Sequence, residues 1–388
     1  MPPLTGPPGA RVCVSLAIGG CIVYAALLLG GGAIYAQETG QGVEGRPGDT
    51  TVVSVSSKVE VKIGGRVHRM SQLVADGRET DVFFTDNDPF PTMLRVDATA
   101  QMGDKLTVGG ALEIGFQQNR PLFVSQDNPD IDIDVTGRMA EIYAAGKVGT
   151  FSLGRGYMAS WVTPEIDLSG TQPASLLAIG ALFGGLKFVD ATTNELTDIR
   201  VRTHHADTER LLIKDRLRYD SPRLLGLQVS ASLAAADRRD VALRMRRDVG
   251  DFTLAGAATY QHKPFGDLDW RSEAGVSFRH EPTGLNATVA GFTQRPPDGR
   301  NAHGRIVKIG WLAGLAPIGK TAFSADVASN FNIAIDGDDG VSFGVFALQN
   351  WDQLGIRAYI GIRQYELDRP DINLKRITVV PFGALIRF

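Results

Sequence analysis

The chain has 388 residues and a formal net charge of −3 at pH 7, which argues against binding of nucleic acid through a basic surface. Its mean hydropathy of −0.04 is too low for a bundle of membrane-spanning helices. The two cysteines, Cys13 and Cys21, both lie near the amino end, so disulfides, thiol catalysis and cysteine-based zinc sites are excluded for the rest of the chain.

Residues 1–36 have the composition of an export signal. Arg11 is the one charged residue among them, and it precedes an apolar run over residues 12–35. The run ends at the small residue Ala36, after which we expect cleavage. An uncleaved membrane anchor is the alternative, since about 20 apolar residues can span a bilayer, but a single Arg and a small-residue end suit cleavage better. Residues 37–58 then form a short lead to the folded part.

From residue 59 onward, apolar and polar residues alternate within short segments. Alternation places the apolar side chains on one face of an extended strand and the polar ones on the other. One face then suits lipid and the other water, and about sixteen such strands is an even number typical of bacterial transmembrane barrels. The predicted strands are 59–70, 92–102, 105–117, 135–147, 149–156, 211–220, 224–235, 241–247, 251–261, 269–281, 284–294, 304–313, 320–333, 341–351, 355–365 and 375–388.

The connections between these strands alternate in length. Short, turn-like connections such as 102–104 and 281–284 are typical of periplasmic turns, whereas the longer polar ones such as 74–91 and 118–134 are typical of extracellular loops. A soluble β-sandwich also alternates, but it does not need aromatic residues at the ends of so many strands. We therefore predict an all-β fold, with an antiparallel transmembrane β-barrel over residues 59–388 in an outer membrane.

The segment 135–147 is the one predicted strand that does not alternate cleanly. If Arg138 points inward, then Val135, Met139 and Tyr143 point outward, but so does Glu141. A charge near the bilayer midplane costs about 2–4 kcal/mol. A β-bulge in this strand, or burial of Glu141 in a subunit interface, would remove the conflict.

Several short motifs resemble those of a known family. They are FSLGRGY at 151–157, PEIDLSGT at 164–171, RYDSPR at 218–223 followed by LQVSAS at 227–232, and the terminal Phe388. These pieces resemble the end of strand five, the third loop and later strands of the Gram-negative general diffusion porins. The resemblance covers the chain in architecture and only these pieces in motif.

The resemblance implies a homotrimer of barrels of about sixteen strands, embedded among outer-membrane lipids and lipopolysaccharide. Each barrel would pass small hydrophilic solutes and ions by passive diffusion, through a pore narrowed by the inward-folded third loop, here residues 157–210. It implies that Glu165 and Asp167 are the carboxylates of this loop and that Arg155 belongs to the basic wall facing it. It also implies that Phe388 is recognised by the barrel-assembly machinery.

The chain departs from the family pattern at residues 172–188, which are apolar and rich in glycine. This stretch could stiffen the loop, or it could occlude the pore and leave a barrel with a structural or adhesive role. We expect the loop to fold into the lumen, because its apolar middle would otherwise face water.

Strand parity independently places a set of basic residues on the polar, inward side. Three of them occupy consecutive inward positions, where like charges repel unless carboxylates or passing anions offset them. We expect these three to face the loop carboxylates and to give a weak preference for anions. The predicted inward basic residues are Lys62, Arg66, Arg95, Lys214, Arg216 and Arg218.

The chain shows no motif of an enzyme or of a cofactor site. Its six histidines include no His-Glu-x-x-His pattern, and no Gly-x-Ser-x-Gly sequence occurs. His204 and His205 are neighbours whose side chains point in opposite directions on an extended chain, so we expect no metal there. The acidic run over residues 127–134 could bind calcium or bridge to lipopolysaccharide through divalent ions, but a solvated loop is the favoured interpretation.

Overall fold

The structure is a computed structural model that describes residues 51–56, 59–161, 166–206 and 213–388. The described part is nearly all β, with one short helix, α1 (Val201–His204), and one 3-10 turn, η1 (Asp352–Leu354). None of its helices has the length and apolar character needed to span a membrane. The expected export signal and its cleavage site lie outside the described residues.

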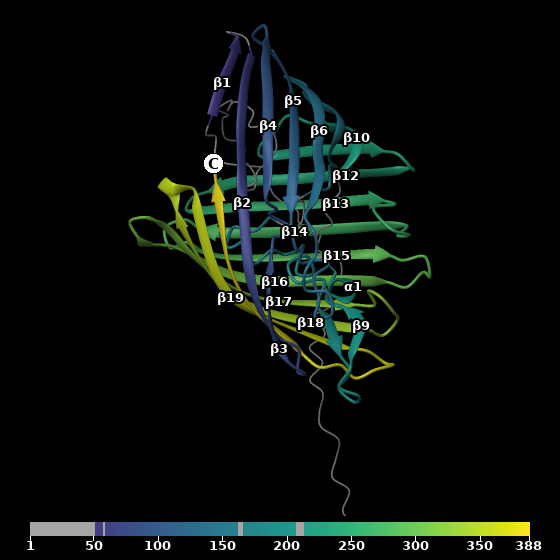
Figure 1. Cartoon of the computed structure of the whole chain (residues 1–388). Coiled ribbons are helices and arrows are strands. Elements are labelled where there is room, and N and C mark those ends of the chain that lie inside the picture. Colours follow the sequence, from purple (N-terminus) through teal and green to yellow (C-terminus); the bar gives the residue numbers. More distant parts are fainter. Residues whose placement is uncertain (1–50, 57–58, 162–165, 207–212) are drawn as a thin grey trace, which may run out of the picture. The chain divides into compact units, whose positions relative to one another are not determined.

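Sixteen antiparallel strands of the described part close into a barrel. β2 pairs with β4 through its first half and with β20 through its second half, and β7 pairs with β10 across the long segment between them. In Figure 1 the strands β2, β4, β5 and β6 run steeply across the teal and green strands. The sixteen are β2 (Val59–Ala75), β4 (Met93–Met102), β5 (Leu106–Gln117), β6 (Asp134–Gly146), β7 (Gly149–Tyr157), β10 (Ile213–Asp220), β11 (Leu227–Ala234), β12 (Arg238–Val249), β13 (Phe252–His262), β14 (Trp270–His280), β15 (Leu285–Arg295), β16 (Ala302–Ala316), β17 (Gly319–Phe331), β18 (Asp339–Trp351), β19 (Ile356–Asp368) and β20 (Ile377–Arg387).

Each predicted strand therefore corresponds to one strand of the barrel, and the predicted fold class is confirmed. Four shorter strands were not predicted. β1 (Thr51–Ser56) and β3 (Thr80–Thr85) pair with the two ends of β2, while β8 (Lys187–Val189) and β9 (Leu196–Arg200) form a hairpin within the long segment after β7. Such short strands between polar loops carry too few alternating residues to stand out in the sequence.

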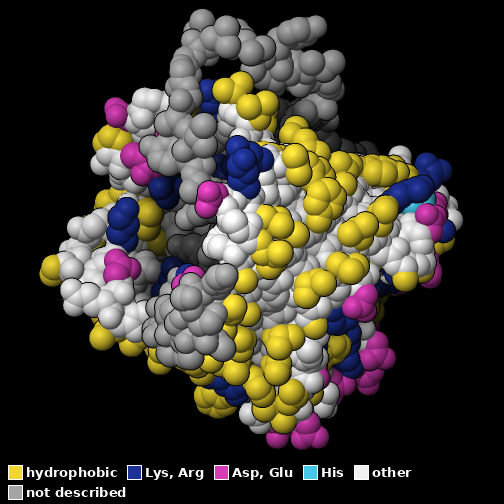
Figure 2. Space-filling model, turned by 90° about the horizontal axis from the view of Figure 1, so that it is seen from above, with side chains coloured by type: hydrophobic (Ala, Val, Ile, Leu, Met, Phe, Trp, Pro, Cys, Tyr) yellow, Lys and Arg dark blue, Asp and Glu magenta, His cyan; other side chains and the backbone are white. Residues whose placement is uncertain are grey.

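Side-chain exposure follows the predicted parity. On β5, Leu112 is 57% exposed, whereas its neighbour Glu113 is 2% exposed. On the last strand, Phe382 and the terminal Phe388 point outward. Hydrophobic side chains cover much of the flank seen in Figure 2, and charged ones gather toward its margins. This outer face is the apolar surface that lipid requires.

A β-bulge resolves the irregular strand. The register between β5 and β6 shifts at Arg138, so that Glu113 lies opposite Met139 and the next residue lies opposite Gly137. The extra residue reverses the parity of the later part of β6, and Met139, Glu141 and Tyr143 point inward. The prediction that Met139 and Tyr143 face lipid is therefore wrong, and Glu141 is not a charge in the bilayer.

The main hydrophobic core of the described chain lies inside the barrel and is formed with the long segment after β7. Leu177 and Ile179 pack on inward-facing Ala290 and Ile306. In a second cluster, other side chains of the same segment pack against β2, β18, β19 and β20. The loop members of this second cluster include Ala174, Leu182, Phe183, Leu186, Phe188 and Val201.

Candidate functional site

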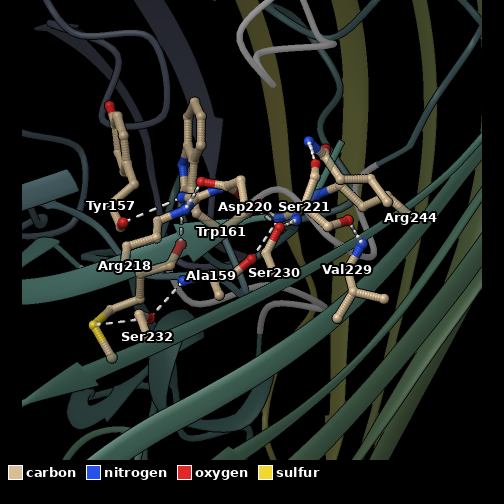
Figure 3. A network of polar contacts seen from close by, with 12 residues as sticks. Tyr157, Ala159, Trp161, Arg218, Asp220, Ser221, Val229, Ser230, Ser232 and Arg244 are labelled. Atoms are coloured by element: carbon tan, nitrogen blue, oxygen red, sulfur yellow. Dashed lines mark hydrogen bonds and ion pairs between the residues drawn. The ribbon is translucent and has the colours of Figure 1, made fainter. Parts of the chain in front are cut away.

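The long segment enters the barrel directly after β7, and its first turn is fastened to two strands. The amide of Ala159 donates to Ser232 on β11 over 2.8 Å, and the amide of Ser160 donates to the carboxylate of Asp240 on β12 over 2.7 Å. Arg244 of β12 donates to the carbonyl of Trp161 over 2.8 Å. Figure 3 shows Ala159, Trp161, Ser232 and Arg244 from close by. We call residues 158–161 and 166–180 the belt.

The belt then follows the inner wall from β14 to β19. The amide of Leu168 donates to Ser277 on β14 over 3.1 Å, and Thr171 donates to Ser324 on β17 over 2.9 Å. Tyr365 on β19 donates its hydroxyl hydrogen to the carbonyl of Ile179 over 2.7 Å. Because the anchors come from several strands of this wall, the belt lies along its inner surface.

Asp167 is a structural member of the belt. Its Oδ2 accepts a hydrogen bond from the Nζ of Lys308 on β16 over 2.7 Å, and both side chains are 1% exposed. Ser169 donates to the same carboxylate through its amide and its hydroxyl. The expectation that Asp167 faces Lys214, Arg216 and Arg218 is wrong, because its charge is neutralised at the opposite wall. Glu165 lies outside the described residues.

An arginine cluster faces inward from β2, β4 and β6. Glu113 stands at its centre, 3.3 Å from the Nη1 of Arg95 and 2.6 Å from the Nε of Arg138. Arg95 also forms a bidentate ion pair with Asp97, in which its Nε and Nη2 each lie 2.7 Å from a carboxylate oxygen. Arg66 lies beside them, with its guanidinium 5.5 Å from the centre of the Phe90 ring. We call Arg66, Arg95 and Arg138 the arginine wall.

The arginine wall carries more positive charge than its carboxylates offset. Three guanidinium groups share Glu113 and Asp97, and Arg66 donates its Nε to the carbonyl of Pro91 over 2.8 Å rather than to an acid. Asp86, which also acts on Arg66, lies 3.8 Å from a further arginine, Arg69, so the surplus remains. The inward positions of Arg66 and Arg95 agree with strand parity. Arg138 was expected to point inward but was not named as a site residue. The conflict over Glu141 was the signal for the bulge, which turns Glu141 inward after it.

The three consecutive basic positions on β10 point inward as expected, but carboxylates of the wall offset two of them. Arg216 forms an ion pair with Glu141, and Arg218 forms a bidentate ion pair with Asp220, with N···O distances of 2.8 and 2.9 Å. The side chain of Lys214 is half-buried on the same face. The predicted repulsion is therefore relieved by carboxylates of the wall and not by Asp167.

Arg155 and Lys62 differ from the predicted basic wall. Arg155 is exposed on the outer face of β7 with Phe151, directly across from Asp215 on β10, so its assignment to the lumen is wrong. Lys62 lies 3.7 Å from Glu60, and both side chains are more than a third exposed. An exposed pair of this kind contributes little to stability.

The two neighbouring histidines lie in different surroundings. The ring of His205 packs against Tyr365 at 4.9 Å, and burial lowers its pKa to about 3. The Nε2 of His204 lies 3.1 Å from Arg369. In the described ranges no group of three or more His, Cys, Asp or Glu side chains could hold a metal ion.

A closed barrel with an inward belt and an arginine wall defines a channel-forming protein of the outer membrane. The model of the Gram-negative porin family matches residues 24–369, and the chain belongs to this family. No curated protein matches the sequence. The protein is thus an outer-membrane channel for passive diffusion, which the family favours over an occluded structural barrel.

Solved porins share the fold at low sequence identity. The anion-selective porin from Comamonas acidovorans is 14% identical with a TM-score of 0.58, over 85% of this chain and 100% of that chain. OmpT of Vibrio cholerae, folded in vitro, is 12% identical with a TM-score of 0.57, over 87% and 100%. Salmonella typhi OmpF in complex with daunomycin is 11% identical with a TM-score of 0.54, over 87% and 100%.

Proposed function

We propose that the channel passes small hydrophilic solutes with a weak preference for anions, and that the arginine wall sets this preference. The observation that carries the proposal is the surplus positive charge of Arg66, Arg95 and Arg138 over Glu113 and Asp97. Ions respond to the field where low-dielectric walls confine it more than to the net charge of the chain. The likeness to an anion-selective porin supports the same direction.

Reversal potentials in a salt gradient test the proposal. Changing Arg66, Arg95 and Arg138 together to Gln removes the surplus, so the reversal potential should move toward cations. The matched control is Arg305→Gln, since this arginine lies on the outer face of β16 and should leave the potential unchanged. An unchanged potential in the triple variant, with a shift in the control, would place the selectivity elsewhere.

We further propose that the channel is a homotrimer whose subunits meet through the outer face of β4 to β7. The strands β13, β14, β17 and β18 carry outward aromatic residues near both ends, as lipid-facing strands do, whereas β4 and β6 carry none and β5 and β7 carry one each, Phe116 and Phe151. An apolar hollow of about 620 Å³ lies on this face, bordered by Ala98, Gly110 and Ala144. One form of OmpT of Vibrio cholerae is a trimer.

Filling the hollow tests the interface. Ala144→Trp should reduce the trimer fraction in detergent, measured by light scattering after size exclusion, because the bulky ring would hold the subunits apart. Ala287→Trp, outward on β15, is the control and should leave the fraction as in the unchanged protein. A full trimer fraction in Ala144→Trp would remove this face from consideration.

Export through the 1–36 signal is part of the same proposal, and an intact mass that includes these residues would contradict it.

A further inference from the structure

We propose that the constriction contains a subsite for planar organic anions, such as aromatic carboxylates, on the stacked rings of Tyr157 and Trp161. The two ring centres are 3.6 Å apart and the ring planes differ by 12°. Tyr157 is 8% exposed, so its ring is covered, whereas Trp161 is half-buried and offers the open surface of the stack. The subsite rests on the proposed function, since a solute must enter the constriction to reach it.

The stack is held in place through the backbone that carries it. The carbonyl of Tyr157 accepts hydrogen bonds from Arg216 over 2.8 Å and from Arg218 over 3.2 Å. The carbonyl of Trp161 accepts one from Arg244, and its amide donates to Met158 over 3.2 Å. Figure 3 shows Tyr157 and Trp161 together with Arg218 of β10 and Arg244 of β12. A fixed platform loses little entropy when a flat solute lies on it.

The surroundings of the stack select for negative charge. Arg138 of the arginine wall donates to the hydroxyl of Tyr157 over 2.9 Å, whereas Arg216 and Arg218, which contact its carbonyl, are paired with Glu141 and Asp220. A planar cation would be repelled by the surplus charge of the arginine wall, and an aliphatic anion would gain the charge interaction without the stacking. A planar anion gains both.

Current block in planar bilayers tests the subsite with two probes of equal charge and similar size. Benzoate is planar and cyclohexanecarboxylate is not. We expect the concentration of benzoate that halves the potassium chloride current to be roughly threefold to tenfold lower, as stacking predicts. The difference between the probes should vanish in Trp161→Leu and persist in part in Trp161→Phe. Trp270→Leu, the same change on the outer face, should keep the full difference.

Equal block by both probes in the unchanged protein would overturn the subsite, and so would a difference that survives in Trp161→Leu. Trp161→Met, which refills the volume without a ring, replaces the Leu variant if the latter does not give a heat-modifiable barrel. Failure of the proposed function looks different, because the unchanged protein would then conduct no potassium chloride current or would show no anion preference, whichever probe is added.

Discussion

The wall that supports the belt holds its charged side chains in buried ion pairs. Lys308 meets Asp167, and Arg363 meets Asp326 with two contacts of 2.8 Å and no exposed area on either side chain. On the facing wall, three arginines share two carboxylates and keep a surplus. A buried ion pair can hold the belt in position, but its two charges cancel and it exerts little electrostatic force on a solute in the pore. The surplus charge of the arginine wall, in contrast, acts on ions that pass. The two walls therefore separate positioning of the pore from selection within it.

The largest expected effect is the loss of stability when one of these buried ion pairs is broken. Lys308→Met leaves the carboxylate of Asp167 buried without its cation, and loss of one partner of such a pair costs about 3–5 kcal/mol. The midpoint of urea unfolding in lipid vesicles should fall accordingly. Adding Asp167→Leu should recover most of the loss, because a buried pair and an apolar pair of similar volume are nearly equivalent. Lys263→Met, at a half-exposed side chain, is the control. A midpoint in Lys308→Met equal to that of the control would show that the pair does not hold the belt.

The second effect concerns the loop that borders the arginine wall. Asp86 follows β3, and burial raises its pKa to about 6 from 3.8. The folded state therefore holds a proton that the unfolded state releases, and the associated stability is full below pH 3.8 and is lost as the pH rises through about 6. The loss should be about 2–3 kcal/mol. Unfolding of Asp86→Asn should lack this dependence, while Asp104→Asn, at an exposed turn, should retain it. A pH profile of Asp86→Asn that matches the unchanged protein would refute the assignment.

The contrast between the walls also predicts which carboxylate controls selectivity. Glu113→Gln removes one of the two acids of the arginine wall, so the reversal potential should move toward anions. Asp167→Asn should move it much less, because Lys308 already neutralises that charge. Both variants need to give heat-modifiable barrels for the comparison to hold. A larger shift in Asp167→Asn than in Glu113→Gln would reverse the roles of the two walls.

The alternation of apolar and polar residues along each strand accounts for the features of the fold and site that the sequence predicted. Strand parity is set by neighbouring residues, so the inward positions of Arg66 and Arg95 follow from the sequence. Parity also puts Arg155 outward with Phe151, and only the assumed family role had placed it in the lumen. Lys308, the partner of Asp167, is 141 residues away in the sequence, so the alternation within one segment cannot predict this contact. The bulge at Arg138 was visible only as a conflict in alternation, which shows where a pattern fails and not how the chain resolves it.

The smallest effect is expected at Lys62, which lies on the same wall as the arginines but in water. Its side chain is 38% exposed and lies 3.7 Å from Glu60, so Lys62→Gln should change the free energy of unfolding by less than about 1 kcal/mol. Any shift of the reversal potential toward cations should be small in dilute salt and should disappear near 1 M, where screening shortens to about 3 Å. Charges of the arginine wall are buried and screened less, so the shift in their triple variant should persist at the same salt. If both shifts vanished together in concentrated salt, the surplus charge of the arginine wall would be acting from open water, and its burial would not be what sets the selectivity.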